Sequence, residues 1–138
     1  MTNFSAVENK ITAIKKYLSI AKKYQKYSQE EIEKTPDLKG AVERYLYLVC
    51  QASIDLAEAV ISIKNFRKPT TYRESFKILG EEEILPDEVV EKLIKMAGFR
   101  NFIAHDYSEI DYSKVYDVLQ NGLNDIEDFI LQIKNKIL

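Results

Sequence analysis

The sequence is poor in the residues that build metal and redox sites. Its 138 residues include one cysteine and one histidine. A single thiol, Cys50, cannot form an internal disulfide, which favours a reduced, cytoplasmic compartment. One histidine and one cysteine cannot supply a zinc cluster, and the consecutive acids of residues 81–83 are poor convergent ligands. We therefore expect a protein without a metal and without a cofactor.

Long apolar runs and glycine-rich loops are also missing. The longest wholly apolar run, Tyr45 to Cys50, is far too short to cross a bilayer. Residues 1–5 lack the basic and apolar regions of a secretory signal. The sequence has neither a Walker phosphate loop nor a nucleophile elbow. These absences predict a protein that does not enter a membrane and is neither a P-loop nucleotidase nor an α/β-hydrolase.

An excess of positive charge is absent too. The net charge is −2, whereas a general nucleic-acid binder is usually basic. Residues 1–34 hold seven lysines against four glutamates, a balance of +3, and residues 80–111 hold nine acids against three basic residues, a balance of −6. A site for RNA in this chain would therefore need a local basic cluster, or one completed by a second subunit.

Helical periodicity is the dominant pattern, and no sustained alternation indicates a strand. In residues 5–28 the apolar positions are spaced 4-3-4-3, as on one helix face. Ser28 and Glu31 form a capping box that restarts a helix before Pro36, and Asp37 is expected to cap the next helix. Thr71 and Glu74 form a second capping box, which opens a short helix that Gly80 can stop. The patterns and their start and stop signals predict helices at 5–28, at 38–65, from Thr71 to Gly80, from Pro86 to about Ala104, and at 112–136.

All three prolines lie between predicted helices, and no linker or internal repeat divides the chain. We predict one all-α domain over residues 1–138. Its architecture is expected to be an antiparallel up-and-down bundle of four long helices plus one short helix.

The only histidine lies in a polar stretch that contains groups able to bind and cleave a phosphodiester. Arg100 offers a planar fork for two phosphate oxygens, and His105 can act as acid or base near neutral pH. On an ideal helix their side chains are about 140° apart. Asn101 lies four residues before His105 and could orient the imidazole or contact phosphate. Alternatively, the helix ends near Ala104.

A single histidine cannot be the base and the acid at the same moment. A symmetric dimer that joins two copies of the stretch would supply two imidazoles, so the chemistry favours a homodimer as a hypothesis. The simpler interpretations are also open: His105 as a helix-end partner, Arg100 in a surface ion pair with Glu91, Asp106 or Glu109, and Tyr107 as a packed aromatic. Asp55, on the second long helix, is predicted either to hold Arg100 or His105 or to have a surface or capping role.

Several ordered blocks resemble the HEPN domain in its HepT-like toxin form. The R-x4-H-x-Y pattern of Arg100, His105 and Tyr107 is the family's signature. Similar blocks are found at Tyr72–Leu79, Ile84–Pro86, Met96–Asn101 and Ile103–Tyr107, and on the second helix from Glu43 to Asp55. The resemblance covers roughly residues 40–120 and implies the helical bundle known for HEPN domains.

The resemblance also implies an activity and a partner. HEPN proteins of this type are metal-independent endoribonucleases, usually homodimers with the motif residues lining a shared cleft. HepT-like proteins are toxins of a type VII-like toxin–antitoxin pair, whose antitoxin is a minimal nucleotidyltransferase of the MntA type. That antitoxin transfers AMP from ATP to the motif tyrosine, which is Tyr107 here. An adenylate beside Arg100 and His105 would block an RNA phosphate by bulk and negative charge.

Two alternatives to an RNase are kept. One is a non-catalytic helical module that binds nucleotide or serves as the partner subunit of a nucleotidyltransferase, which the acidic balance around the motif favours. The other is a dimeric scaffold whose polar motif only stabilises the interface.

Overall fold

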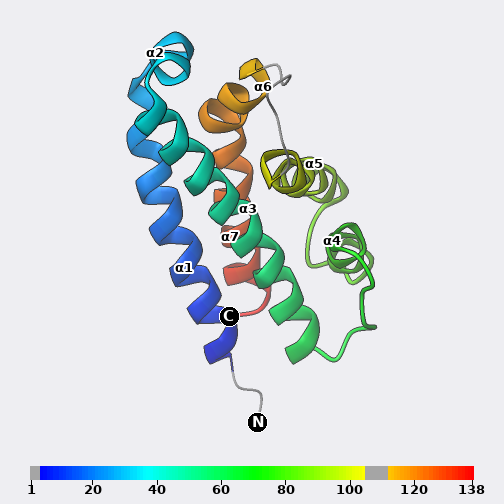
Figure 1. The fold of residues 1–138 in the computed structure, drawn as a ribbon. Coiled ribbons are helices and arrows are strands. Elements are labelled where there is room, and N and C mark those ends of the chain that lie inside the picture. The colour runs from blue at the N-terminus through cyan, green and yellow to red at the C-terminus, as the bar shows by residue number, and fades with distance from the viewer. Residues whose placement is uncertain (1–3, 105–111) are drawn as a thin grey trace.

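The computed structural model describes residues 4–104 and 112–138, without the side chains of Phe102 and Ala104. This part of the chain is helical and contains no strand (Figure 1). The α-helices are α1 (Ser5–Lys22), α2 (Gln29–Lys34), α3 (Pro36–Ile63), α4 (Tyr72–Glu81), α5 (Asp87–Ala104), α6 (Tyr112–Asp117) and α7 (Leu123–Lys136). A 3-10 turn, η1 (Lys23–Lys26), follows α1, and a π-helical turn, η2 (Val118–Gly122), joins α6 to α7. The predicted all-α bundle is confirmed.

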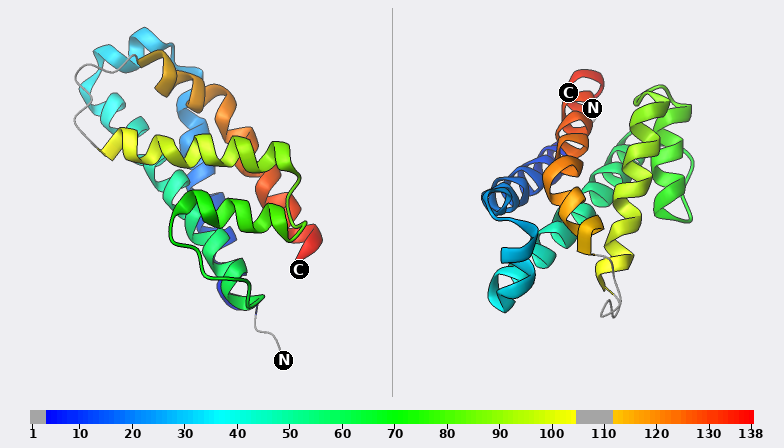
Figure 2. Two further views of the ribbon diagram at one scale, coloured as in Figure 1. Left: turned by 90° about the vertical axis from the view of Figure 1, so that its right-hand side faces the viewer. Right: turned by 90° about the horizontal axis from the view of Figure 1, so that it is seen from above.

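Helix α3 is the central element, and other helices pack along several of its sides. Helix α1 runs beside it over most of its length, and α2, α4 and α5 also contact it (Figures 1 and 2). One 18-residue window of α3 has a mean hydropathy of 1.5, enough by length and composition to cross a membrane, but 56% of that window is buried inside the protein. Its apolar character is explained by its place in the core.

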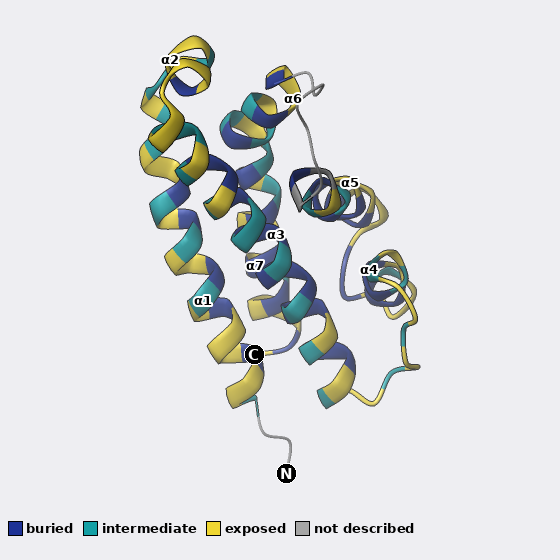
Figure 3. Cartoon of the chain, viewed as in Figure 1, coloured by how far each residue is buried: buried dark blue, intermediate teal, exposed yellow. Residues whose placement is uncertain are grey.

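The predicted apolar face of the first helix is buried as the spacing required. All five of its stripe residues pack against the rest of the core: Val7, Ile11, Ile14, Leu18 and Ala21. The outer faces of the long helices are exposed, and the inner faces of α1, α3 and α7 are buried (Figure 3). Between α4 and α7, the rings of Phe76 and Phe129 meet edge to face with centroids 5.8 Å apart. Burial of this continuous core provides the main stabilisation of the bundle.

The capping signals near α2 and α4 are largely confirmed. Ser28 Oγ accepts from Glu31 N at 3.1 Å, and Glu31 Oε1 accepts from Ser28 N at 3.0 Å. Thr71 Oγ1 likewise accepts from Glu74 N at 3.1 Å, so the first half of the second capping box is present. The Glu74 carboxylate, however, accepts from Arg67 Nη1 at 2.8 Å. Arg67 also reaches Glu81 at 2.9 Å and so ties the loop before α4 to both ends of that helix.

The start of α3 differs from the prediction that Asp37 caps it. Pro36 is the first residue of the helix, Thr35 occupies the N-cap position, and Asp37 lies in the first turn. Proline suits this position because its missing N–H would have no partner there. At Asp37 the carboxylate still has a favourable interaction with the helix dipole.

Gly80 does not stop α4, contrary to the prediction. The helix continues to Glu81, and the residue in the left-handed conformation is Glu83, with φ of 59°. Gly80 instead lies against α5, where an added Cβ would be 2.9 Å from Val90 Cγ2. The glycine is required by the close approach of two helices, which local sequence does not reveal.

Substitution of Gly80 by alanine should destabilise the protein, since Val90 is buried and β-branched and cannot move aside. We expect a loss of about 1–3 kcal/mol in unfolding free energy from overpacking, measured by urea denaturation. Gly40→Ala is the matched control: Gly40 is exposed in α3 with no atom near its added Cβ, so alanine there should stabilise by about 0.5–1 kcal/mol. Equal changes in unfolding free energy at the two positions would contradict the packing role of Gly80. So would a Val90→Ala substitution that fails to recover the stability lost in Gly80→Ala.

Candidate functional site

The polar site lies at the C-terminal part of α5, where this helix contacts α3 and α4. Arg100, on α5, is half-buried and reaches across to residues of both neighbouring helices. Its Nη1 donates to Gln51 Oε1 on α3 at 2.8 Å. On the other side of the guanidinium, Nε and Nη2 donate to Asn101 Oδ1 at 3.2 and 2.9 Å. The fork is therefore held at both ends.

Gln51 links Arg100 to Asp55, which lies one helical turn further along α3. Gln51 Nε2 donates to Asp55 Oδ1 at 3.0 Å, and the amide oxygen of the same side chain accepts from Arg100. Asp55 can only accept, so it fixes which end of the Gln51 amide faces the arginine. The predicted link between Asp55 and the motif therefore runs through Gln51, and among the described residues Asp55 forms no direct bond to Arg100.

Among the described residues, the acceptors around Arg100 are neutral amides. Within residues 4–104 and 112–138, Arg100 forms no ion pair. The possible pairing with Glu91 does not occur, while Asp106 and Glu109 lie outside the described residues. Amide oxygens orient a guanidinium without cancelling its charge, whereas a carboxylate would neutralise it. Arg100 is thus positioned and still cationic, which suits it to bind a phosphate.

An aromatic ring supports the guanidinium from α4. Arg100 Cζ lies 5.7 Å from the centroid of the Tyr72 ring. Gly98 allows the ring to come this close to α5, because a Cβ there would lie only 3.2 Å from the Tyr72 hydroxyl oxygen. A cavity of about 420 Å³ opens beside the pair, bordered by the loop of residues 69–71 and by Glu58. The guanidinium therefore lies near an aromatic ring and borders an open cavity.

Cys50 lies next to this site but is chemically inert. It is buried, and its Sγ donates to the backbone oxygen of Met96 at 3.2 Å. Burial raises the pKa of the Cys50 thiol to about 12, and the charge of Arg100 only partly opposes this. A neutral buried thiol is neither a nucleophile nor a metal ligand. Among the described residues, moreover, no three His, Cys, Asp or Glu side chains converge as a metal site would require.

His105 and Tyr107, the predicted proton-transfer residue and modification target, lie outside the described residues. Helix α5 is described as far as Ala104, the residue before His105 in sequence. Asn101 is exposed and contacts Arg100. Sequence reasoning overlooked two residues that position the arginine: Gln51, which has no distinguishing sequence pattern, and Tyr72, which appeared only within a block of family resemblance.

Comparison with known proteins identifies the family. A model of the family described as Ribonuclease HepT-like matches residues 14–133. The chain belongs to this family. The resemblance noted in the sequence is thereby confirmed, over a longer stretch than the motif blocks alone covered.

Two curated relatives extend over nearly the whole chain. The chain is 34% identical over 127 residues to the mRNA nuclease HepT of Shewanella oneidensis, covering 91% of this chain and 94% of that protein. It is 29% identical over 140 residues to the tRNA nuclease HepT of Aphanizomenon flos-aquae, covering 100% and 95% respectively. The two relatives act on different RNA classes, as their names state.

Solved structures of toxin–antitoxin complexes share the fold. The tri-AMPylated HEPN toxin of Shewanella oneidensis, in complex with its MNT antitoxin, superposes with a TM-score of 0.87 at 29% identity, covering 96% of this chain and 98% of that one. A toxin–antitoxin complex with AMP-PNP also gives a TM-score of 0.87, at 28% identity over 95% of this chain and 98% of the other. The HepT-like bundle described above is therefore the fold of these toxins.

Proposed function

We propose that this chain is a metal-independent endoribonuclease and the toxin of a two-gene, type VII-like toxin–antitoxin pair. The observation that carries the proposal is the Arg100 guanidinium, fixed by neutral amides beside an open cavity in a chain of the HepT-like ribonuclease family. The nuclease names of the two curated relatives support the activity. A cytoplasmic setting, where such RNA substrates occur, is part of the proposal.

The reaction is an attack of the RNA 2′-hydroxyl on the adjacent phosphorus. The 2′-oxygen–phosphorus bond forms as the bond to the 5′-oxygen breaks, which leaves a 2′,3′-cyclic phosphate and a 5′-hydroxyl. A base takes the proton of the 2′-hydroxyl, and an acid supplies a proton to the leaving 5′-oxygen. His105 has the chemistry for either role. Arg100 stabilises the charge on the phosphate oxygens in the transition state.

The roles of the supporting residues follow from their contacts. Gln51 and Asn101 hold the guanidinium at two points, so its orientation is set before RNA binds. Such preorganisation lowers the cost of stabilising the transition state. Asp55 acts one step further away, through the amide of Gln51. A homodimer would add a second histidine, so that one imidazole is the base and the other the acid.

The partner in this proposal is a nucleotidyltransferase antitoxin of the MntA type. The complexes of similar toxins with such antitoxins support it, and so does the tri-AMPylated state of the Shewanella oneidensis toxin. In this chain the modified residue would be Tyr107, within the R-x4-H-x-Y pattern. Adenylate phosphates there would compete with RNA for the positive charge of Arg100.

The second candidate is a non-catalytic helical subunit of a nucleotidyltransferase, and one observation favours it. The segment that contains the motif, residues 80–111, has a net charge of −6. An acidic surface repels RNA unless a local basic cluster offsets it. The first of the experiments below separates the two candidates.

Removal of the His105 imidazole should abolish cleavage. We expect purified His105→Ala to cut RNA at least about 10²-fold more slowly than wild type. The assay is run in EDTA, product ends are analysed for 2′,3′-cyclic phosphate, and circular dichroism verifies the fold of the variant. Full activity in the variant would refute the role of His105, and an inactive wild type would favour the non-catalytic subunit.

A carboxylate at position 51 should impair the site more than loss of the side chain. In Gln51→Glu the new charge faces Arg100 and cancels its positive charge, whereas Gln51→Ala only removes one tether. We expect kcat/KM for RNA cleavage to fall about 10- to 100-fold in Gln51→Glu and less in Gln51→Ala. The reverse order would show that tethering, and not a free positive charge, is what Arg100 requires.

Tyr107 should be the acceptor of AMP. With ATP and a nucleotidyltransferase antitoxin of the MntA type, we expect adenylate on the wild type and none on Tyr107→Phe, measured by intact-mass spectrometry. Tyr17→Phe, on α1, is the control and should be modified as the wild type is. Adenylation of Tyr107→Phe at the normal level would place the acceptor elsewhere.

A further inference from the structure

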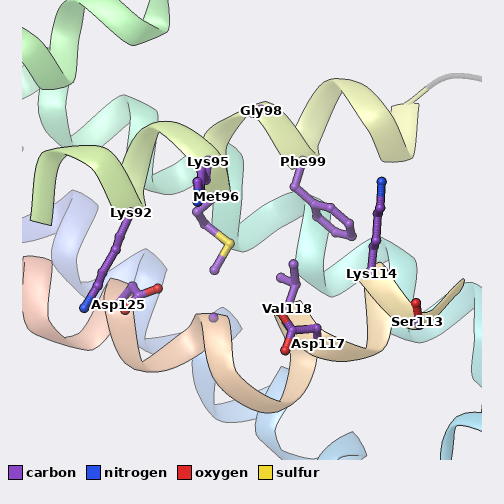
Figure 4. Close-up of a pocket in the computed structure, with 11 residues that line it drawn as sticks. Lys92, Lys95, Met96, Gly98, Phe99, Ser113, Lys114, Asp117, Val118 and Asp125 are labelled. Carbon is purple, nitrogen blue, oxygen red and sulfur yellow. The ribbon is translucent and has the colours of Figure 1, made fainter. Parts of the chain in front are cut away.

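A second hollow lies along α5, on the side that faces α6, η2 and α7. Its volume is about 530 Å³, and its lining comes from these four elements (Figure 4). Met96, Phe99 and Val118 form an apolar floor, and three lysines stand around it: Lys92 and Lys95 on α5 and Lys114 on α6. We call this hollow the lysine groove. It is separate from the cavity beside Arg100, which faces α3 and α4.

The floor of the groove depends on the π-helical turn η2. Gly122 closes this turn, and a Cβ there would be 2.7 Å from Met96 Cε. The glycine lets the Met96 side chain lie against η2, so that α5 and η2 form one continuous apolar surface. Single π-helical turns inside helices are rare and occur frequently at functional sites. The predicted uninterrupted helix at 112–136 is broken at the point where it borders this groove.

The charges in the groove are unequal along its length. Lys92 lies beside Asp125 at one end (Figure 4). Burial raises the pKa of the Asp125 carboxyl, and the nearby Lys92 partly offsets this. Lys95 and Lys114 rise from the two opposite helices, and Asp117 is the other acid in the lining. Three lysines against two aspartates give the lining of this groove a formal charge of +1, although residues 80–111 as a whole are acidic.

We infer that the lysine groove binds one nucleotide of the RNA strand next to the cleaved bond, with phosphates at Lys95 and Lys114 and a base on the apolar floor. The inference rests on the proposed ribonuclease function and adds a substrate subsite to it. A hollow of this volume is large enough for a nucleotide. Lysines that track phosphate beside apolar side chains that contact bases are the usual means of holding single-stranded RNA.

The position of the groove along α5 fits a substrate subsite. The groove includes Gly98 and Phe99, the residues directly before Arg100. Its other wall begins at Ser113 and Lys114, near the start of α6. A strand that lies in the groove would therefore reach the C-terminal part of α5, where Arg100 is held. The groove thereby places Lys95 and Lys114 together beside the helix that carries Arg100.

The test is the binding of a short 2′-O-methyl RNA, which cannot be cleaved through its 2′-oxygen. Fluorescence anisotropy gives Kd over a range of KCl concentrations for wild type and for the double variant Lys95→Gln/Lys114→Gln. We expect Kd to rise roughly tenfold near physiological salt, and the slope of log Kd against log salt to fall by about 0.7 for each lost phosphate contact.

The matched control is Lys15→Gln/Lys16→Gln, which removes the same charge from exposed positions on α1. We expect its Kd and salt slope to equal those of wild type. If the control weakens binding as much as the groove variant, or if the groove variant binds like wild type, the groove is not the subsite. Binding of free AMP that depends on Lys95 and Lys114, without an effect of these lysines on RNA, would also overturn the inference.

Cleavage measurements keep this inference separate from the proposed function. With a cleavable RNA, the groove variant should show a rise in KM that exceeds any fall in kcat, because the two lysines contact the neighbouring nucleotide and not the reacting phosphate itself. If the wild type is active and the groove variant has the same KM as the wild type, the groove is not an RNA subsite, and the ribonuclease proposal is unaffected. Absence of cleavage by wild type would reject the ribonuclease proposal itself, and RNA binding would then be judged by the anisotropy alone.

Discussion

Burial of α3 is the constraint on which the rest of this structure depends. The helix carries apolar residues on more than one side, so a single neighbour cannot cover it, and α1, α2, α4 and α5 all contact it. Gln51 and Asp55 emerge where α3 passes the end of α5, and there they meet Arg100. The core and the site are thus built on the same helix, and a shift of α3 would change both.

The structure holds Arg100 in a defined position and keeps it apart from the lysine groove. On one side of α5, amides and the Tyr72 ring orient the guanidinium. On another side, lysines surround an apolar hollow. A chain with a net charge of −2 cannot rely on a general attraction for RNA. It would have to place a few cationic side chains at the RNA site itself. Three such residues, Lys92, Lys95 and Arg100, lie on α5, within the acidic segment 80–111.

Sequence predicts those features that depend on neighbours in the chain. The Ser28–Glu31 capping box, the buried stripe of α1 and the all-α class follow from local periodicity and spacing, and all were confirmed. Features that depend on distant partners were missed or misread. Gly80 resembled a helix stop, but its role is set by Val90 of the next helix. Gln51 is 49 positions from Arg100, and nothing near it in sequence distinguishes it from a surface glutamine.

The inert state of Cys50 makes this chain a convenient host for chemical labelling. It holds the only thiol of the sequence, buried and with its pKa raised to about 12, so maleimide probes should bypass it in the native protein. A cysteine introduced on any exposed helix face would then be the single reactive group, without prior removal of the natural one. Fluorophores or spin labels placed on α5 and α6 in this way could report on distances across the bundle while the packing around Met96 stays unaltered.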